Sequence, residues 1–339
     1  MSDTRLENDL FKKFQDLCVM VIGDAMIDSY IWGKVNRLSP EAPVPIVDVV
    51  ERSNRLGGAA NVALNIKSLG ARPILCSVIG EDATSKTLIQ LMRDYELDED
   101  GILQSNDRIT TTKFRIFGNN TQLLRVDEET THPILPNDQS RLLQTIKFQV
   151  QTKHPDIIII QDYDKGVITQ YIIQNTIQLA TEAGIKVCVD PKHLNFWAYN
   201  NVFLFKPNLK ELKNGLKSNY NYLLDKFNLE EAIMILQENI NADIVLVTLS
   251  DKGMVIRYST EDDGFHYQAI PAHLRNIADV SGAGDTVISV ASLCLAAGLS
   301  PLDAAKIANV AGGLVCEELG VVPVNAKHLS EEINRLEIL

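Results

Sequence analysis

Short runs made up almost entirely of apolar residues recur along the chain, and they restrict its possible folds more than any other feature. They cover residues 19–22, 74–79, 157–160, 187–189, 202–205 and 244–248. Continuous β-branched runs of this length are typical of strands that are buried on both faces. Helical periodicity lies between many of them, over residues 60–69, 85–95, 139–151, 170–183 and 229–238. The alternation predicts an α/β fold with a doubly wound, mostly parallel sheet and helices on both sides.

Two stretches depart from this alternation and predict a second, smaller sheet. Residues 29–50 and 110–126 carry alternating apolar side chains without a helical period. The pair Asn119-Asn120 inside the second stretch is typical of a hairpin turn. We interpret both stretches as a small β-sheet inserted into the main domain, where it forms a lid or an oligomer contact. From Val280 to the C-terminus the pattern predicts consecutive helices.

Charge and composition exclude several classes of partner. The 339 residues carry a net charge of -12, whereas nucleic acids and anionic membranes both require a basic surface. The five cysteines are scattered and form no C-x-x-C pair, as in proteins of a reducing compartment. Residues 1–15 are too polar for a signal peptide, and the apolar stretch 287–299 is too short to cross a bilayer. We therefore expect a cytoplasmic protein.

The segment from Asp279 to Asp285, Asp-Val-Ser-Gly-Ala-Gly-Asp, is the strongest local signal of chemistry. Successive backbone N–H groups reach the start of the following helix from Ser281, Gly282, Ala283 and Gly284. A phosphate or a developing oxyanion can bind at such an end. Asp285 in the first turn would accept a proton from an attacking hydroxyl. A glycine turn followed by an acidic residue that favours the helix dipole explains the segment equally well.

Two segments resemble nucleotide-binding motifs without matching them. Residues 80–87 approach a P-loop, but Ser85 replaces the glycine before the lysine, and Glu81 and Asp82 would repel a triphosphate. A capped helix start explains this segment better. Residues 279–285 half-match a dinucleotide fingerprint, but Val287 stands where a third small residue is needed. We reject the dinucleotide interpretation of residues 279–285 and favour a capped helix start for residues 80–87.

Polar residues follow several predicted strands, at the edge where doubly wound sheets bind ligands. They include Asp28, Asp162, Lys165 and Lys192. Gly57 and Gly58 would let a sugar ring approach the backbone, and Asn61 offers a donor and an acceptor to hydroxyl groups. Helix capping or exposure to solvent explains these polar residues about as well.

Two further sets of residues suit phosphates. Asn208 and Glu211 share a helix face at i,i+3 spacing, where they could hold a hydrated metal beside a phosphate. Arg115 and Arg125 in the predicted lid, together with Lys165 and Lys192, are candidates to bind a phosphate remote from the reacting hydroxyl. Each of these four cations is equally explained as a solvated surface charge.

The motifs at 57–61 and 279–285 resemble the two signatures of the ribokinase-like carbohydrate kinases, also called the phosphofructokinase-B family. Within it, the segments 23–28, 37–45, 162–166, 190–192 and 207–211 resemble the D-glycero-D-manno-heptose-7-phosphate kinases. The segment 37–45, Arg-Leu-Ser-Pro-Glu-Ala-Pro-Val-Pro, discriminates most because ribokinases and adenosine kinases generally lack it. The departures are small: Ser281 stands where Thr is common, and Gln161 and Asp164 vary the loop around Asp162.

The resemblance implies one ribokinase-like kinase domain over residues 1–339, with ATP at the C-terminal edge of the sheet and a β lid at about 29–50 and 110–126. It implies that Asp285 deprotonates the sugar hydroxyl while the amides of Gly282, Ala283 and Gly284 neutralise charge on the phosphoryl group. Contacts to Mg²⁺-ATP are implied for Asn208, Leu209, Lys210, Glu211, Ser250, Gly253 and Ser281. A monovalent cation and a homodimer joined through the lid are also compatible with it.

The expected reaction is transfer of the ATP γ-phosphoryl group to the anomeric hydroxyl of a heptose 7-phosphate. The 1,7-bisphosphate would feed ADP-heptose and lipopolysaccharide-core synthesis. Some relatives carry a nucleotidyltransferase domain after the kinase, and because this chain stops at Leu339 we expect that activity to be absent. A kinase of another phosphosugar, such as fructose 6-phosphate, is one alternative. A sugar-binding regulator is another, although binding alone needs neither Asp285 nor the pair Asn208 and Glu211.

Overall fold

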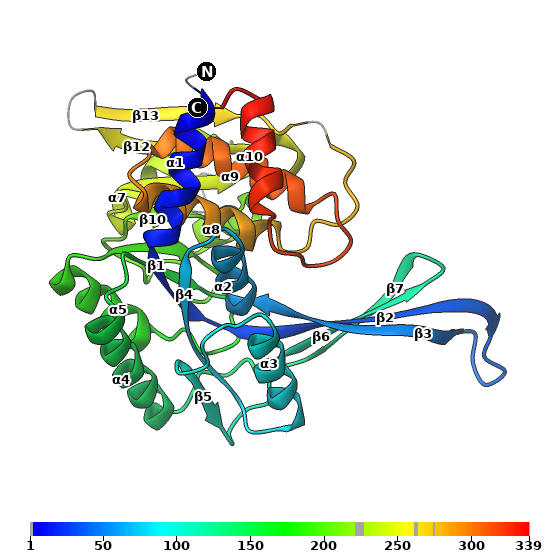
Figure 1. The fold of residues 1–339 in the computed structure, drawn as a ribbon. Helices are drawn as coiled ribbons and strands as arrows, with labels where there is room; N and C mark the ends of the chain where they lie inside the picture. Colours follow the sequence, from blue (N-terminus) through cyan, green and yellow to red (C-terminus); the bar gives the residue numbers. More distant parts are fainter. Residues whose placement is uncertain (1–2, 221–226, 261–263, 274, 339) are drawn as a thin grey trace.

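A nine-stranded sheet forms the centre of the protein, in a computed structural model that describes residues 3–220, 227–260, 264–273 and 275–338 (Figure 1). The strand order is β13-β12-β11-β10-β9-β8-β1-β4-β5. The parallel strands are β1 (Cys18–Gly23), β4 (Arg72–Gly80), β5 (Ile102–Ser105), β8 (Ile157–Gln161), β9 (Lys186–Asp190), β10 (Leu204–Phe205) and β11 (Ile244–Thr248). The antiparallel strands β12 (Met254–Thr260) and β13 (Gly264–Ile270) complete one edge. The predicted doubly wound, mostly parallel sheet is confirmed.

Helices cover both faces of this sheet. One face packs against α1 (Asp3–Asp16), α2 (Ala59–Ser68), α3 (Ala83–Asp94), α8 (Ala283–Ala296), α9 (Pro301–Val315) and α10 (Ala326–Arg335). The other packs against α4 (Pro136–Lys153), α5 (Gln170–Ala183), α6 (Leu209–Asn219) and α7 (Leu229–Ile240). Successive side chains of a strand point to opposite faces. Ile157 and Ile159 of β8 therefore enter the first core, whereas Ile158 and Ile160 enter the second.

A smaller sheet projects from the body, to the right in Figure 1. It has the order β3-β2-β6-β7 and consists of β2 (Ala25–Leu38), β3 (Pro45–Gly58), β6 (Thr112–Gly118) and β7 (Thr121–Glu128). Asn119 and Asn120 join β6 to β7 and both have positive φ, as a tight hairpin turn requires, so that predicted turn is confirmed. The β2–β3 pair runs from Ala25, just after β1 of the large sheet, to Gly58, just before α2.

The P-loop-like segment is a capped helix start, as the sequence indicates. Asp82 accepts a hydrogen bond from the backbone N–H of Ser85, and the Ser85 side chain completes a capping box at the start of α3. The predicted strand 202–205 is shorter than expected, since only Leu204 and Phe205 form β10. Within the described ranges, all five cysteines are buried free thiols and no helix has both the length and the apolar character to span a bilayer.

Candidate active site

The side chain of Asp285 lies in the first turn of α8, deep inside the protein. Gly282 caps this helix with φ 84°, and only 2% of Asp285 is exposed. Asp285 Oδ2 accepts a hydrogen bond from Asn61 Nδ2 (2.9 Å), and Oδ1 accepts from Tyr163 Oη (2.6 Å) and Gln161 Nε2 (3.1 Å). Burial raises the pKa of Asp285 to about 7, although the hydrogen bonds from Asn61 and Tyr163 lower it. The carboxylate can therefore take up a proton near neutral pH.

The amides at the start of α8 are the predicted site for an anion. Gly282 makes no side-chain cap there. Two amides of the predicted set are already paired: the N–H of Ser281 donates to Asp279 Oδ1 at 2.9 Å, and the N–H of Ala283 donates to the Val280 carbonyl at 3.4 Å. Lys206 Nζ lies 3.8 Å from the position that a Cβ of Gly284 would take. Helix amides and a cation together suit a phosphate.

Two cavities that share Ser250 and Gly284 open beside these amides. The larger has a volume of about 970 Å³, and its lining includes the predicted residues Lys192, Asn208, Leu209, Lys210, Glu211 and Ser250. The smaller, of about 430 Å³, is lined by apolar residues such as Met254 and Val287 and by the predicted Gly253. A polar cavity that continues into an apolar one suits a nucleotide, with the phosphates in the first and the base in the second.

Asn208 and Glu211 form the capping box of α6. Asn208 Oδ1 accepts from the Glu211 N–H and Glu211 Oε2 accepts from the Asn208 N–H, both at 2.8 Å. Glu211 Oε1 also pairs with Lys192, whose pKa is raised because Asp190 and Glu211 outweigh the effect of burial. No group of three or more His, Cys, Asp or Glu side chains able to hold a metal occurs among the described residues. Glu211 and Asn208 are of the types that bind Mg²⁺, which usually takes one or two carboxylates, waters and phosphates, but an ion at Glu211 Oε1 would have to displace Lys192.

Several of the predicted sugar-binding residues make close contacts inside the protein. Asn61 is fully buried and donates to Asp285, so it orients the carboxylate from inside. Asp28 forms a buried ion pair with Arg115 across β2 and β6. A Cβ at Gly57 would lie 2.3 Å from Asp28 Oδ2, which explains why a glycine stands there. Gly58 (φ 57°) caps α2 and likewise has no room for a side chain.

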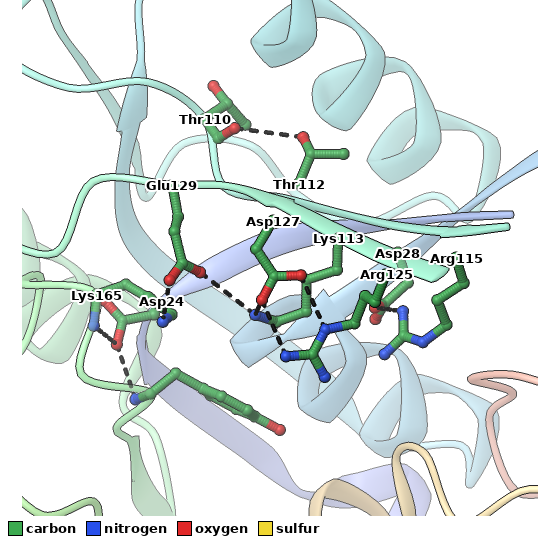
Figure 2. Close-up of polar contacts among 11 residues, drawn as sticks. Asp24, Asp28, Thr110, Thr112, Lys113, Arg115, Arg125, Asp127, Glu129 and Lys165 are labelled. Atoms are coloured by element: carbon green, nitrogen blue, oxygen red, sulfur yellow. Dashed lines mark hydrogen bonds and ion pairs between the residues drawn. The ribbon is translucent and has the colours of Figure 1, made fainter. Parts of the chain in front are cut away.

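The predicted cations Lys165 and Arg125 lie where the small sheet meets the body, together with Lys113, which was not predicted. Figure 2 shows Lys113 and Lys165 on either side of Glu129. Arg125 makes two hydrogen bonds to Asp127, at 2.9 and 3.0 Å, and its side chain is 54% exposed. Each of these cations is held by a carboxylate, so a phosphate that binds here would have to replace one.

Asp162 is fully buried and accepts hydrogen bonds from Tyr199 Oη (2.6 Å), Asn195 Nδ2 (3.2 Å) and the Asp164 N–H (2.8 Å). Like every predicted sugar-binding residue except Lys192, it lines neither cavity. These contacts make Asp162 a support for the loop after β8.

The predicted site residues do not include four side chains that lie around Asp285. Gln161 Nε2 bridges Asp285 and Asp190, and Asp190 Oδ2 forms a buried ion pair with Lys206 Nζ at 3.1 Å. Tyr163 is the third donor to Asp285. Each of these residues stands at or just after the carboxyl end of a parallel strand, and that position is the signal that could have identified them.

Comparisons with known proteins agree with this geometry. The sequence profile of the pfkB family carbohydrate kinases matches residues 17–327. The chain is 36% identical over 313 residues to the bifunctional protein HldE of Sulfurimonas denitrificans, covering 92% of this chain and 63% of that protein. It is 37% identical to HldE of Helicobacter pylori, covering 94% and 66%. The chain thus spans somewhat less than two thirds of the length of these curated relatives.

Solved structures show the same fold. Phosphofructokinase-2 from Escherichia coli in complex with potassium superposes with a TM-score of 0.74 at 17% identity, covering 95% of this chain and 99% of that one. Arabidopsis thaliana ribokinase complexed with ribose and ATP gives a TM-score of 0.68, also at 17% identity, with coverages of 93% and 99%.

Proposed function

This chain belongs to the pfkB family of carbohydrate kinases, and from that membership we propose that it transfers the γ-phosphoryl group of ATP to the anomeric hydroxyl of D-glycero-D-manno-heptose 7-phosphate. One observation carries the proposal. Asp285, a buried carboxylate with a pKa of about 7, stands at the start of α8 and next to cavities that suit a nucleotide. A base, an anion site and a nucleotide site in one place are the parts that phosphoryl transfer needs.

The proposed roles follow from these positions. Asp285 accepts the proton of the attacking sugar hydroxyl. The amides of 282–284, with Lys206, stabilise the negative charge of the transferred phosphoryl group. Glu211 and Asn208 hold Mg²⁺ at the polar end of the cavity, where the bound ion neutralises charge on the phosphates. The small sheet acts as the lid that covers the sugar and excludes water.

We propose the substrate class from two supports. The resemblance of the segments 37–45 and 162–166 to heptose-7-phosphate kinases is one of them. The other is the group of cations Lys113, Arg115 and Lys165 near the base of the lid, which an acidic protein needs if it binds a phosphate remote from the reacting hydroxyl. Binding energy from that phosphate would orient the sugar for attack.

ATP consumption tests the proposal. With Mg²⁺-ATP, the protein should consume ATP in the presence of heptose 7-phosphate and yield a 1,7-bisphosphate, identified by phosphorus-31 NMR. The same heptose without its phosphate should lower kcat/KM by orders of magnitude. Preference for fructose 6-phosphate would support the kinase activity but assign it a different substrate. Binding of the sugar phosphate without ATP consumption would support a regulator instead.

Asp285→Asn should keep the fold and ATP binding but lower kcat by about 10²- to 10⁴-fold, because it removes the base. Asp243→Asn is the matched control, since Asp243 precedes β11 at the opposite edge of the sheet and should leave kcat unchanged. If Asp285→Asn keeps more than about a tenth of the wild-type kcat, Asp285 is not the base.

A further inference from the structure

Three of the four acceptor positions on the carboxylate of Asp285, the proposed base, are already occupied. Each carboxylate oxygen offers two acceptor positions. Both positions of Oδ1 are taken, by Tyr163 and Gln161, and Oδ2 accepts from Asn61. Asn61 and Gln161 are completely buried, whereas Tyr163 lines the 970 Å³ cavity. Tyr163 is therefore the donor that separates the base from the cavity.

We propose that Tyr163 occupies the place of the sugar hydroxyl on Asp285 while no sugar is bound, and leaves that place when the sugar enters. The proposal rests on the proposed kinase function. A phenol on Oδ1 keeps water from that oxygen, which limits the activation of water for attack on ATP. Tyr163 is in this sense a positioning residue, which acts on the reaction through Asp285.

The backbone of Tyr163 is fixed, so the exchange is a movement of its side chain. Asp24 accepts hydrogen bonds from the N–H groups of Tyr163 (2.8 Å), Lys165 (3.2 Å) and Val167 (3.1 Å). These bonds hold the loop after β8 in place. The ring itself is half-buried, and Lys192 Nζ lies 5.1 Å from its centroid on the cavity side, where a cation attracts the aromatic face. The ring can thus turn toward the cavity without unfolding the loop.

The exchange has a distinctive effect on pH dependence. Asp190 and the two lysines Lys192 and Lys206 are the charged groups near Asp285, and Asn61, Gln161 and Tyr163 are its neutral neighbours. The hydrogen bond from Tyr163 lowers the pKa of Asp285, so losing the phenol raises that pKa in the free protein. In the sugar complex the phenol has already left Asp285, so replacing Tyr163 by Phe should leave the pKa of Asp285 in that complex unchanged.

Tyr163→Phe tests the proposal, with Tyr199→Phe as the matched control. Tyr199 Oη also donates to an aspartate at 2.6 Å in the same region, but the acceptor is Asp162 and not Asp285. Hydrolysis of Mg²⁺-ATP without sugar should rise by about tenfold or more in Tyr163→Phe, the size expected for a lost bond to a charged group. It should stay at the wild-type level in Tyr199→Phe.

The pH dependence of kcat/KM and of kcat in Tyr163→Phe is the second test of the proposal. The acidic limb of kcat/KM, which reports the free enzyme, should move to higher pH, while the acidic limb of kcat, which reports the sugar complex, should stay. Equal movement of both limbs would mean that the phenol remains on Asp285 throughout the reaction and would overturn the proposal. Unchanged hydrolysis together with unmoved limbs would also overturn it. Absence of phosphoryl transfer to any sugar in the wild-type protein is a different result, because it contradicts the proposed function itself.

Discussion

At the scale of single residues, the unusual feature is a fully buried carboxylate that must lose its proton to act. Burial raises the pKa of Asp285 to about 7, far above the ordinary value for aspartate. The base is active when deprotonated, so kcat/KM should fall about tenfold for each pH unit below about 7 and level off above it. Steady-state rates between about pH 5.5 and 8.5 would measure this. A profile that stays flat below about pH 7 would contradict the assignment.

Local sequence patterns identify Asp285 but not its hydrogen-bond partners. The glycine-rich turn before α8 indicates the proposed anion site because its spacing alone predicts a helix start. Gln161 and Tyr163 reach Asp285 from more than a hundred residues away along the chain. Their approach depends on the order of the strands, and no local spacing encodes that order. The same reason explains why Lys206 was missed.

At the scale of secondary-structure elements, the start of α6 combines two roles that can be separated by experiment. Glu211→Ala should raise the Mg²⁺ concentration for half-maximal rate more than it changes sugar affinity, because Glu211 is the proposed metal ligand. It also removes the third-position side chain of a capping box. Ser85→Ala removes the equivalent side chain from α3, far from the cavities, so both variants should lose up to about 1 kcal/mol of stability. An equal Mg²⁺ titration in both variants would exclude the metal role.

The loop after β8 should depend strongly on Asp24. Asp24→Ala leaves three backbone N–H groups without their acceptor, and we expect it to cost about 3 kcal/mol or more in urea unfolding. Asp156 accepts a single backbone N–H, from Cys18 at 2.7 Å, so Asp156→Ala should cost about 1 kcal/mol. Equal losses would show that the loop is held by other contacts.

The elements themselves were largely predictable, for a physical reason. Strands such as β8 are buried on both faces and so consist of continuous apolar residues, which few other structures tolerate. The antiparallel strands β12 and β13 at the sheet edge were not predicted. β13 alternates polar and apolar residues and is mostly exposed, so it lacks the apolar run that marks the central strands. β10 is short because only two of its predicted residues pair with both neighbours.

At the scale of the whole molecule, the projecting sheet carries apolar side chains that its own fold leaves uncovered. Leu38 is 64% exposed, Val50 70% and Leu124 54%, and every residue of β7 is exposed. A small sheet with one uncovered apolar surface is marginally stable in water. Such surfaces on a protein usually mark a contact with another molecule. A second copy of the chain that packed against this sheet would cover its exposed apolar side chains.

We therefore predict a homodimer joined through the lid sheets. Light scattering at micromolar concentration should give twice the mass of the chain. Val50→Asp combined with Leu124→Asp should yield monomers, because charged side chains on both edge strands oppose burial against a partner. Phe148→Asp is the matched control: Phe148 is 61% exposed on α4, away from the lid, and its replacement should leave the dimer intact. The monomeric variant should also lose kcat/KM for the sugar more than affinity for ATP, because in our proposal the small sheet covers the sugar and not the nucleotide. A wild-type monomer, or a double variant that remains dimeric, would place the contact elsewhere.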